Sequence, residues 1–467
     1  MTAATTLIES TVERVAAALA APWPESQRAA PVSLEGGTGT ALLLAELARR
    51  DPARLPAAHA RIAPAARALA GTASAGLSHG PAAVLAAVQA ARIGDHYVRL
   101  RQTLTTHLAS EQLARLSAPS PGPGVGWSDY DVITGPTGTG RLLLAAVTEG
   151  DTAERAAAEP ALHATLDHLV TLARPIRVDG QLVPGWWVPN ERQASAGDRR
   201  VFPRGDVNLG LAHGIAGPLA LLVRSAEYGI TVDGQVDAVY AIAGWLATRA
   251  RHDTFGPAWE PRLGLDEEIA RARGAGSGAG PGSGPGPGSA SGSGSAEVSA
   301  YTTAFSGAFG GAWCYGAVGI ANALFRAGRL TGEEDWGRLA LQSAHALLHR
   351  PDALERLQGP TVCHGLAGFV QSLWRLGTLA EDAVLLDHAA TVAEQLAGLW
   401  DPAAAFGYRH VAPVDRQSGW ESDQPLGLED NPGVLEGAAG VAAALLSVTS
   451  GAQRAADPVW DRVLLLS

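Results

Sequence analysis

The chain has 467 residues, a mass of 47.9 kDa and a net charge of −11. This length allows one large domain or two to three smaller ones, and 46% hydrophobic with 17% charged residues predicts a globular, core-forming protein. The acidic balance argues against a nucleic-acid-binding protein. The sequence contains no run of about 20 apolar residues that would predict a membrane span. Residues 1–20 include Glu9 and Glu13 and lack the basic start of a signal peptide.

Helical patterns dominate the chain. Their apolar residues recur at steps of three and four, and they are rich in Ala, Leu, Arg and Glu. Alternating patterns are scarce, and residues 181–189 are the best candidate for an extended piece or hairpin. In chain order, the predicted amphipathic helices cover residues 9–20, 98–116, 152–173, 235–251, 335–349 and 383–399.

Two segments carry the residues that break helices. Residues 117–128 are rich in Ser, Pro and Gly and predict a loop. Residues 274–296 contain only Gly, Ala, Ser and Pro, so they have almost no apolar area to bury and predict a flexible insertion. Helical patterns of the same kind continue on both sides, so we expect the insertion to lie in a surface loop of one domain spanning residues 1–467.

An internal repeat organises the sequence. A Gly-x-x-Gly pattern, followed by a run rich in small residues and Leu, occurs seven times, with Ala83 replacing the second Gly of copy two. Each copy predicts the start of a buried apolar helix, and the amphipathic helices between copies would cover it. The copies occupy residues 34–47, 78–88, 133–147, 212–223, 314–325, 363–374 and 435–446.

Two architectures suit seven helix pairs. One is an open α-solenoid of helical hairpins. The other is an all-α, closed α/α toroid with seven inner and seven outer helices. We favour closure because the motif falls at the same helix end in every copy and requires a shared centre.

The residues just before the first Gly of each copy are unusually polar for a buried helix start. The position directly before it holds Glu35, His79, Thr134, His213, Tyr315, His364 and Glu436. The position before that holds both cysteines of the chain, Cys314 and Cys363, in consecutive copies. In a toroid these positions surround the mouth of the central cavity, so the two cysteines should be neighbours, with His364 beside them.

Two Cys and one His make the three-ligand set of a catalytic zinc site, with a fourth position left for water or substrate. Helix N-termini favour the thiolate form that zinc requires. The alternatives are inert core cysteines, a disulfide and a Cys/His protease pair. Two cysteines in a chain of this length favour a reducing, cytoplasmic compartment over a disulfide scaffold.

His213 shares its repeat position with His364 and is a candidate general acid/base, although a structural histidine is the alternative. His79 shares the position without further support. Asp131 lies four residues before Gly135 and could face the cavity. Spacing alone ranks it no higher than Asp129, because a carboxylate at a helix start is usually a cap.

Four segments together resemble the lanthipeptide (lantibiotic) synthetase C cyclases, the LanC-like family: YDVITGPTG, LGLAHGIAG, AWCYGAVGIA and CHGLAG. The resemblance spans roughly residues 30–450. It implies an α/α toroid with one zinc ion held by Cys314, Cys363 and His364. It also implies acid/base roles for His213 and Asp131 and places Tyr315 at the site.

The resemblance implies a function in lanthipeptide and antibiotic biosynthesis. The enzyme would add the Cys thiol of a precursor peptide to a dehydroalanine or dehydrobutyrine, closing a thioether ring. A separate dehydratase would act first, and the cyclase would associate with it and with an exporter at the membrane. Two other functions stay open, namely an enzyme that uses zinc for hydrolysis or adds a small external thiol such as glutathione, and a non-catalytic scaffold that binds peptides.

One position departs from the family pattern. Many members carry an Arg a few residues before the WCYG motif, where this chain has Gly310 and Gly311. Arg204 is a candidate replacement only because it lies near the fourth copy.

Overall fold

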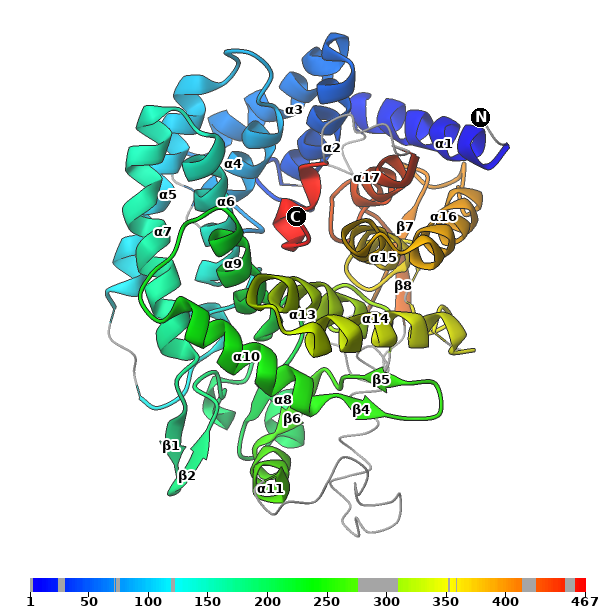
Figure 1. Ribbon diagram of the computed structural model, residues 1–467. Coiled ribbons are helices and arrows are strands. Elements are labelled where there is room, and N and C mark those ends of the chain that lie inside the picture. The colour runs from blue at the N-terminus through cyan, green and yellow to red at the C-terminus, as the bar shows by residue number, and fades with distance from the viewer. Residues whose placement is uncertain are drawn as a thin grey trace.

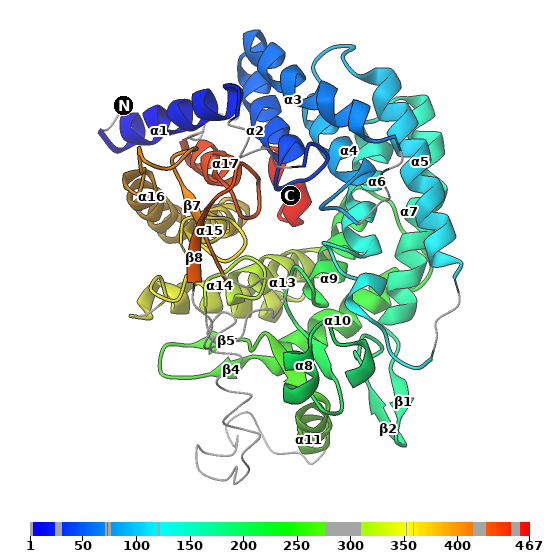
Figure 2. The ribbon, with the colours of Figure 1, turned by 180° about the vertical axis from the view of Figure 1, so that it is seen from behind.

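In the computed structural model, the helices form a closed ring of two layers (Figure 1; Figure 2). The structure describes residues 3–23, 30–70, 72, 76–118, 122–275, 310–351, 353–357, 359–413, 426–449 and 458–467. The inner layer holds the seven repeat helices: α2 (Gly37–Arg50), α4 (Pro81–Ala90), α6 (Pro136–Glu149), α9 (Ala216–Glu227), α13 (Ala317–Thr331), α15 (Leu366–Ala380) and α17 (Ala438–Thr449).

Each inner helix packs against an outer, amphipathic helix. The six predicted amphipathic helices are all present within a few residues of their expected bounds. The outer layer consists of α1 (Ala3–Ala20), α3 (Leu55–Ala68), α5 (Val98–Leu116), α7 (Thr152–Leu172), α10 (Gln235–Arg249), α14 (Glu334–His349) and α16 (Ala383–Gly398). Helix α1 precedes the first copy but covers α17 of the last one, so the two ends of the chain complete one helix pair.

The ring is closed, as predicted, because α17 packs against α2 as well as against α15. Backbone hydrogen bonds between described residues also join the segments that precede neighbouring inner helices at six of the seven junctions, and Val434 N–H donates to Leu34 O across the junction between the last and first copies (2.9 Å). An open solenoid would leave these two ends apart. The other bonds run from Leu34 to Ser78, Leu77 to Ile133, Val132 to Ala212, Leu211 to Cys314 and Val362 to Leu435.

Steric contacts explain why the second position of the repeat motif is glycine. A Cβ on Gly319 would lie 2.4 Å from the carbonyl oxygen of Trp313, and a Cβ on Gly368 would lie 1.9 Å from that of Val362. The segment before each helix therefore folds back onto the first helical turn. This close approach holds the residues that precede Gly316 and Gly365 at the N-terminal ends of the inner helices, which form the mouth of the ring.

Residues 458–467 form a C-terminal plug that lies in the middle of the ring in both ribbon views (Figure 1; Figure 2). Trp313 Nε1 donates to Leu464 O (3.0 Å), and Asp461 is buried against Arg375 of α15. The plug also contacts α2, α4 and α6. Most of its residues are buried against the inner helices.

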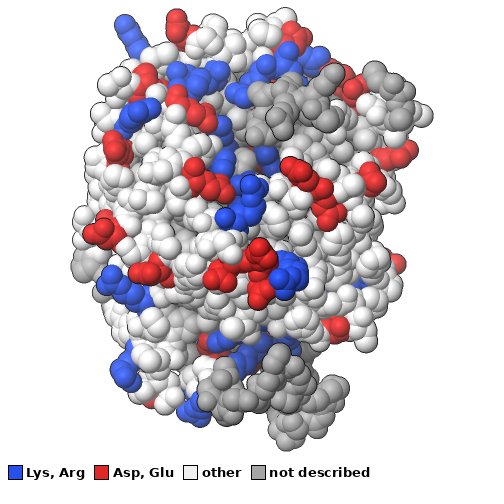
Figure 3. All heavy atoms as spheres, viewed as in Figure 1, with Lys and Arg blue, Asp and Glu red and all other residues white. Residues whose placement is uncertain are grey.

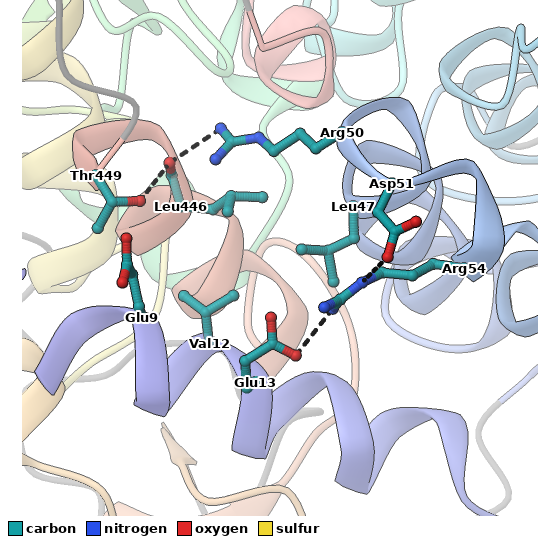
Figure 4. A pocket seen from close by; sticks show the side chains of 9 residues that line it. All are labelled: Glu9, Val12, Glu13, Leu47, Arg50, Asp51, Arg54, Leu446 and Thr449. Carbon is teal, nitrogen blue, oxygen red and sulfur yellow. Dashed lines mark hydrogen bonds and ion pairs between the residues drawn. The ribbon is translucent and has the colours of Figure 1, made fainter. Parts of the chain in front are cut away.

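The seam between the first and last copies carries a pocket of about 350 Å³ between α1, α2 and α17 (Figure 4). Arg54 pairs with Glu13 of α1 and with Asp51, while Arg50 donates to Leu446 O of α17 (3.1 Å). Polar contacts therefore supplement apolar packing where the ring closes.

Within the described ranges, short strands form four two-stranded sheets in the connections between the helices. The predicted extended piece at 181–189 begins with β2 (Gln181–Val183), which pairs with β1 (Ile176–Val178) in a hairpin. The other pairs are β3 (Asp206–Asn208) with β6 (Arg262–Gly264), β4 (Arg251–His252) with β5 (Pro257–Ala258), and β7 (Arg409–Pro413) with β8 (Leu426–Asp430). Two further helices, α8 (Ala196–Val201) and α11 (Leu265–Ala275), lie beside β3 and β6.

Most of the predicted insertion 274–296 lies outside the described residues. Its first two residues, Gly274 and Ala275, form the end of α11 and not the expected loop. On the face shown in Figure 3, acidic and basic side chains are interspersed, so the net charge of −11 is not gathered there into one acidic field. No helix in the described part of the chain is long and apolar enough to cross a bilayer.

Candidate metal centre and acid–base pair

The two cysteines and His364 meet at the mouth of the ring. Cys314 precedes α13 and Cys363 precedes α15, which are neighbouring inner helices. One ligand atom from each of the three residues lies within 4.8 Å of the others, and Cys314 Sγ is 3.9 Å from His364 Nδ1. Cys314 is buried, whereas Cys363 and His364 are half-buried, so the cluster is reachable from the mouth. The predicted proximity of the two cysteines is thus present.

These residues fit a zinc ion. Zn–S distances of about 2.3 Å and Zn–N distances of about 2.0 Å place tetrahedral ligand atoms about 3.5–3.8 Å apart, close to the observed separation. Both cysteines are free thiols. Thiolate and imidazole ligands also match the preference of zinc for soft and borderline donors. The described residues contain no second group of this kind.

The surroundings favour charge on Cys314 and on His364. Burial opposes ionisation of the Cys314 thiol, but the hydrogen bond with Cys363 and the charge of His364 together lower its pKa well below the usual range. Burial likewise opposes protonation of His364, and the charge of Cys314 raises the pKa of this imidazole. The contact with Cys314, burial and the charge of Glu436 raise the pKa of the Cys363 thiol well above its usual range. The chain therefore stabilises one thiolate of the pair, on Cys314, and a bound metal would have to displace the proton of Cys363.

His213 and Asp131 form a second polar pair at the mouth. The Nδ1 atom of His213 lies 2.5 Å from Oδ2 of Asp131. The Asp131 side chain is fully buried, whereas that of His213 is 26% exposed. Oδ1 of Asp131 also accepts the backbone N–H groups of Thr134 (2.7 Å) and Gly135 (2.5 Å). Asp131 is therefore both a helix-start acceptor and the partner of His213 at Nδ1.

Residues 126–131 make two further contacts with His213. The rings of Trp127 and His213 stack, with centroids 5.0 Å apart and planes inclined by 23°. The hydroxyl of Tyr130 donates to the backbone oxygen of His213 (3.0 Å). Sequence analysis assigned residues 117–128 to a loop and missed Trp127; the signal was an aromatic residue within GWSDYD, directly before a repeat copy.

The β3–β6 sheet reaches the site from the other side. Asn208 and Arg262 are paired residues of this sheet. The Asn208 amide lies 3.5 Å from the Tyr315 hydroxyl, and the ring of Tyr315 is 6.0 Å from that of His213. Arg262 Cζ lies 5.0 Å from the centroid of the Trp127 ring. Desolvated cation–π contacts of this kind are worth about 2 kcal/mol.

Comparison with known proteins bears on the family and the fold of the chain. The family model described as lanthionine synthetase C-like protein matches residues 30–465. The chain belongs to this family. Among solved structures, it resembles one titled nisin cyclase, with a TM-score of 0.68 and 19% sequence identity over 98% of this chain and 96% of that chain. The comparison with curated proteins gives no match.

Within the LanC-like family, the position of the missing arginine needs a separate account. Arg204 does not fill it, contrary to the weak expectation from sequence, because its guanidinium is on the surface and pairs with Asp179 (2.6 Å) and Asp266. The arginine that the structure brings near the site is Arg262 of β6, which lies between the fourth and fifth copies of the repeat. Sequence analysis gave no signal for it.

The remaining candidates lie apart from both groups. His79 forms an isolated β-bridge with Ser33 and is not a member of the Cys–Cys–His cluster. Asp129 accepts the N–H of Gly126 (2.8 Å) and pairs with Arg192 (3.1 Å), as expected of a cap and surface ion pair. Geometry therefore separates Asp131 from Asp129, which spacing could not do.

Proposed function

We propose that this LanC-like protein is a zinc-dependent cyclase that forms thioether rings in a dehydrated precursor peptide. The observation that carries the proposal is the position of two chemical groups at one mouth. The ligand set Cys314, Cys363 and His364 lies beside a histidine–carboxylate pair that has one ring nitrogen to spare. Tyr315 connects them, because it follows Cys314 in the chain and its ring neighbours that of His213.

The chain's residues have separable tasks. Cys314, Cys363 and His364 would hold Zn²⁺, which would supply the positive charge that lowers the pKa of the substrate thiol and keeps it nucleophilic at neutral pH. The substrate sulfur then forms a bond to the β-carbon of dehydroalanine or dehydrobutyrine. The π electrons move to the α-carbon and its carbonyl, and the α-carbon takes up a proton. The thiol has lost one proton and the α-carbon has gained one, so the mass of the peptide is unchanged.

His213 is the proposed proton donor to the α-carbon. Its Nδ1 is engaged by Asp131, so transfer would occur from Nε2. Asp131 is buried and carries hydrogen bonds from two backbone N–H groups, and it would orient the ring and stabilise its protonated form. Tyr315 is held at the same mouth by Asn208 and is the second candidate for contact with the developing charge.

The substrate must arrive already dehydrated, so we infer that a separate dehydratase acts first. Association with that dehydratase and with an exporter, in the cytoplasm, is part of the same proposal and rests on the family alone. Nothing in the proposal involves nucleic acid.

The test is incubation of the zinc-loaded protein with a dehydrated precursor peptide, with and without a small external thiol. Ring closure removes alkylatable cysteines without changing the mass, so alkylation followed by mass spectrometry reports it. Loss of free thiols without added thiol supports the cyclase. A mass increase that requires the external thiol would instead identify a thiol-adding enzyme. Zinc binding with neither reaction would identify a peptide-binding scaffold.

A further inference from the structure

A chain of side-chain contacts leads from a buried arginine to the proposed proton donor. Arg262 lies over the Trp127 ring, and the Trp127 ring stacks on the imidazole of His213. The three residues come from distant parts of the sequence: Trp127 from the turn before α6, His213 from the turn before α9, and Arg262 from β6.

Arg262 is fixed on all sides. Its Nε donates to Asp206 Oδ2 (2.7 Å), and its two terminal nitrogens donate to Asp198 and to the side-chain oxygen of Gln193. The side chains of Arg262, Asp198 and Asp206 are all at least nine-tenths buried. Phe202 lies against the same guanidinium, at 4.3 Å from the ring centroid to Cζ. A buried cation held this tightly offers Trp127 a rigid surface.

Trp127 has no comparable anchor of its own. Its indole Nε1 is buried and has no hydrogen-bond partner among the residues that the structure describes, so the ring is placed by its faces and not by its polar tip. The faces contact Arg262 and His213. Arg262 therefore sets the orientation of the Trp127 ring, and the Trp127 ring in turn sets the orientation of the His213 imidazole.

His213 needs two constraints to present Nε2 in one direction. The contact with Asp131 fixes the position of Nδ1 but still permits the ring plane to turn about that contact. Stacking on Trp127, with planes inclined by 23°, limits that rotation. A displacement of about 1 Å at a proton donor can cost about 10²-fold in rate.

We propose that Trp127 and Arg262 are positioning residues for His213. Neither touches the reacting atoms in this scheme, and each acts through the plane of the imidazole ring. The inference rests on the proposed function, in which His213 transfers a proton. It also gives Arg262 of the β3–β6 sheet a task at a site where the usual family arginine is replaced by Gly310 and Gly311.

The test compares Trp127→Leu, which removes the stack, with Trp127→Phe, which retains an aromatic face. The matched control is Trp336→Leu, because Trp336 is also half-buried and packs against one aromatic ring, Tyr240, in the outer layer. We expect Trp127→Leu to lower kcat for ring closure about 10- to 100-fold, with KM and zinc content unchanged. Trp127→Phe should stay within about threefold of the unmodified protein.

A second readout distinguishes positioning from general damage. In protein labelled with ¹⁵N-histidine, the signals of His213 are identified by their loss in His213→Ala. We expect sharp signals from a single orientation of the imidazole in the unmodified protein and in Trp336→Leu, and averaged or broadened signals in Trp127→Leu. Arg262→Lys, which keeps the charge but loses the planar fork, should shift the same signals in the same direction.

Several results would overturn the inference. Among them are a Trp127→Leu protein as active as Trp336→Leu, a Trp127→Phe protein as slow as Trp127→Leu, and a parallel loss of zinc. If the unmodified protein closes no ring at all, the proposed function fails, yet the histidine signals still decide the positioning role. Unchanged His213 signals in Trp127→Leu would then refute it.

Discussion

Nδ1 of His213 lies 2.5 Å from Oδ2 of Asp131, although the two residues are 82 positions apart in the chain. The pair forms because copies three and four of the repeat are neighbours in the ring, and Val132 N–H donates to Ala212 O between them (3.0 Å). This backbone bond joins the residues directly beside Asp131 and His213. The closed arrangement of the repeat copies therefore also sets the distance between Asp131 and His213.

The first prediction separates proton transfer from metal binding. His213→Ala should keep its zinc and its fold but slow ring closure by about 10²- to 10⁴-fold, the usual contribution of a general acid/base. His364→Ala should lose zinc first and activity as a consequence. Excess zinc should therefore rescue His364→Ala in part and leave His213→Ala unrescued. Metal analysis and the alkylation assay measure both effects. Equal zinc loss in the two variants would make His213 a ligand and move the search for a proton donor to Asp131 and Tyr315.

The second prediction concerns the carboxylate. Asp131→Asn preserves the shape of the side chain but replaces the carboxylate that contacts Nδ1 of His213 with a neutral amide. We expect kcat to fall by about 10²-fold or more, with zinc content unchanged. Asp129→Asn is the matched control, because Asp129 lies two residues away and pairs with Arg192 at the surface. Comparable losses in the two variants would show that Asp131 serves the fold alone.

The third prediction is close to one zinc equivalent per chain, measured on the purified protein by metal analysis. Cys314→Ala and Cys363→Ala should each lose most of it, because two protein ligands hold the ion weakly. His79→Ala is the control, since His79 shares the repeat position but lies outside the cluster. Full zinc retention in both cysteine variants would refute the assignment.

The sequence was sufficient for the ring because its signal is repeated. Seven glycine motifs at helix starts predicted seven inner helices, and the steric contact at residues such as Gly319 and Gly368 explains why the motif persists. The cysteines could be placed side by side for the same reason: both occupy one position of consecutive copies. Repetition converts a local pattern into a spatial prediction.

The features that sequence reasoning missed are those outside the repeat. Arg262 and Asn208 meet through pairing of β3 with β6, and three-residue strands leave too short a pattern to detect. The contact between Trp127 and His213 joins a loop to a repeat position. Asp131 could not be ranked above Asp129, because only the neighbouring copy shows which carboxylate faces a histidine.

The fourth prediction concerns the inserted tract 274–296. It consists of Gly, Ala, Ser and Pro, so its replacement by a short Gly/Ser linker beginning after Ala275 should leave the melting temperature nearly unchanged. Thermal unfolding of the two proteins is the measurement. A large decrease in melting temperature would show that the tract packs against the ring. Loss of thioether formation in the peptide, at unchanged stability of the protein, would instead indicate a role in substrate capture.

The last prediction concerns acid stability of the C-terminal plug. The buried Asp461 carboxylate accepts from Arg375 (2.5 and 2.8 Å), from Gln371 (2.6 Å) and from Ser467 (2.7 Å). Burial opposes its ionisation, but the charge and hydrogen bonds of Arg375 outweigh burial and hold the pKa of Asp461 below its usual value. The folded pKa is thus lower than the unfolded one, which is about 3.9. The stabilisation is therefore present above that pH and is lost as the pH falls towards the folded pKa.

Asp461→Asn should consequently lower the free energy of unfolding by about 3–5 kcal/mol at pH 7, because it leaves Arg375 buried without a counter-charge. The difference between the two proteins should narrow progressively below about pH 5, because this carboxyl group is protonated in the unfolded chain before it is protonated in the folded one. Urea unfolding at a series of pH values measures it. The control is Asp335→Asn, since Asp335 pairs with Arg338 at the surface and its removal should change stability by less than about 1 kcal/mol. A difference that does not depend on pH would show that the plug is held by packing of Trp460 and Leu464 and not by this ion pair.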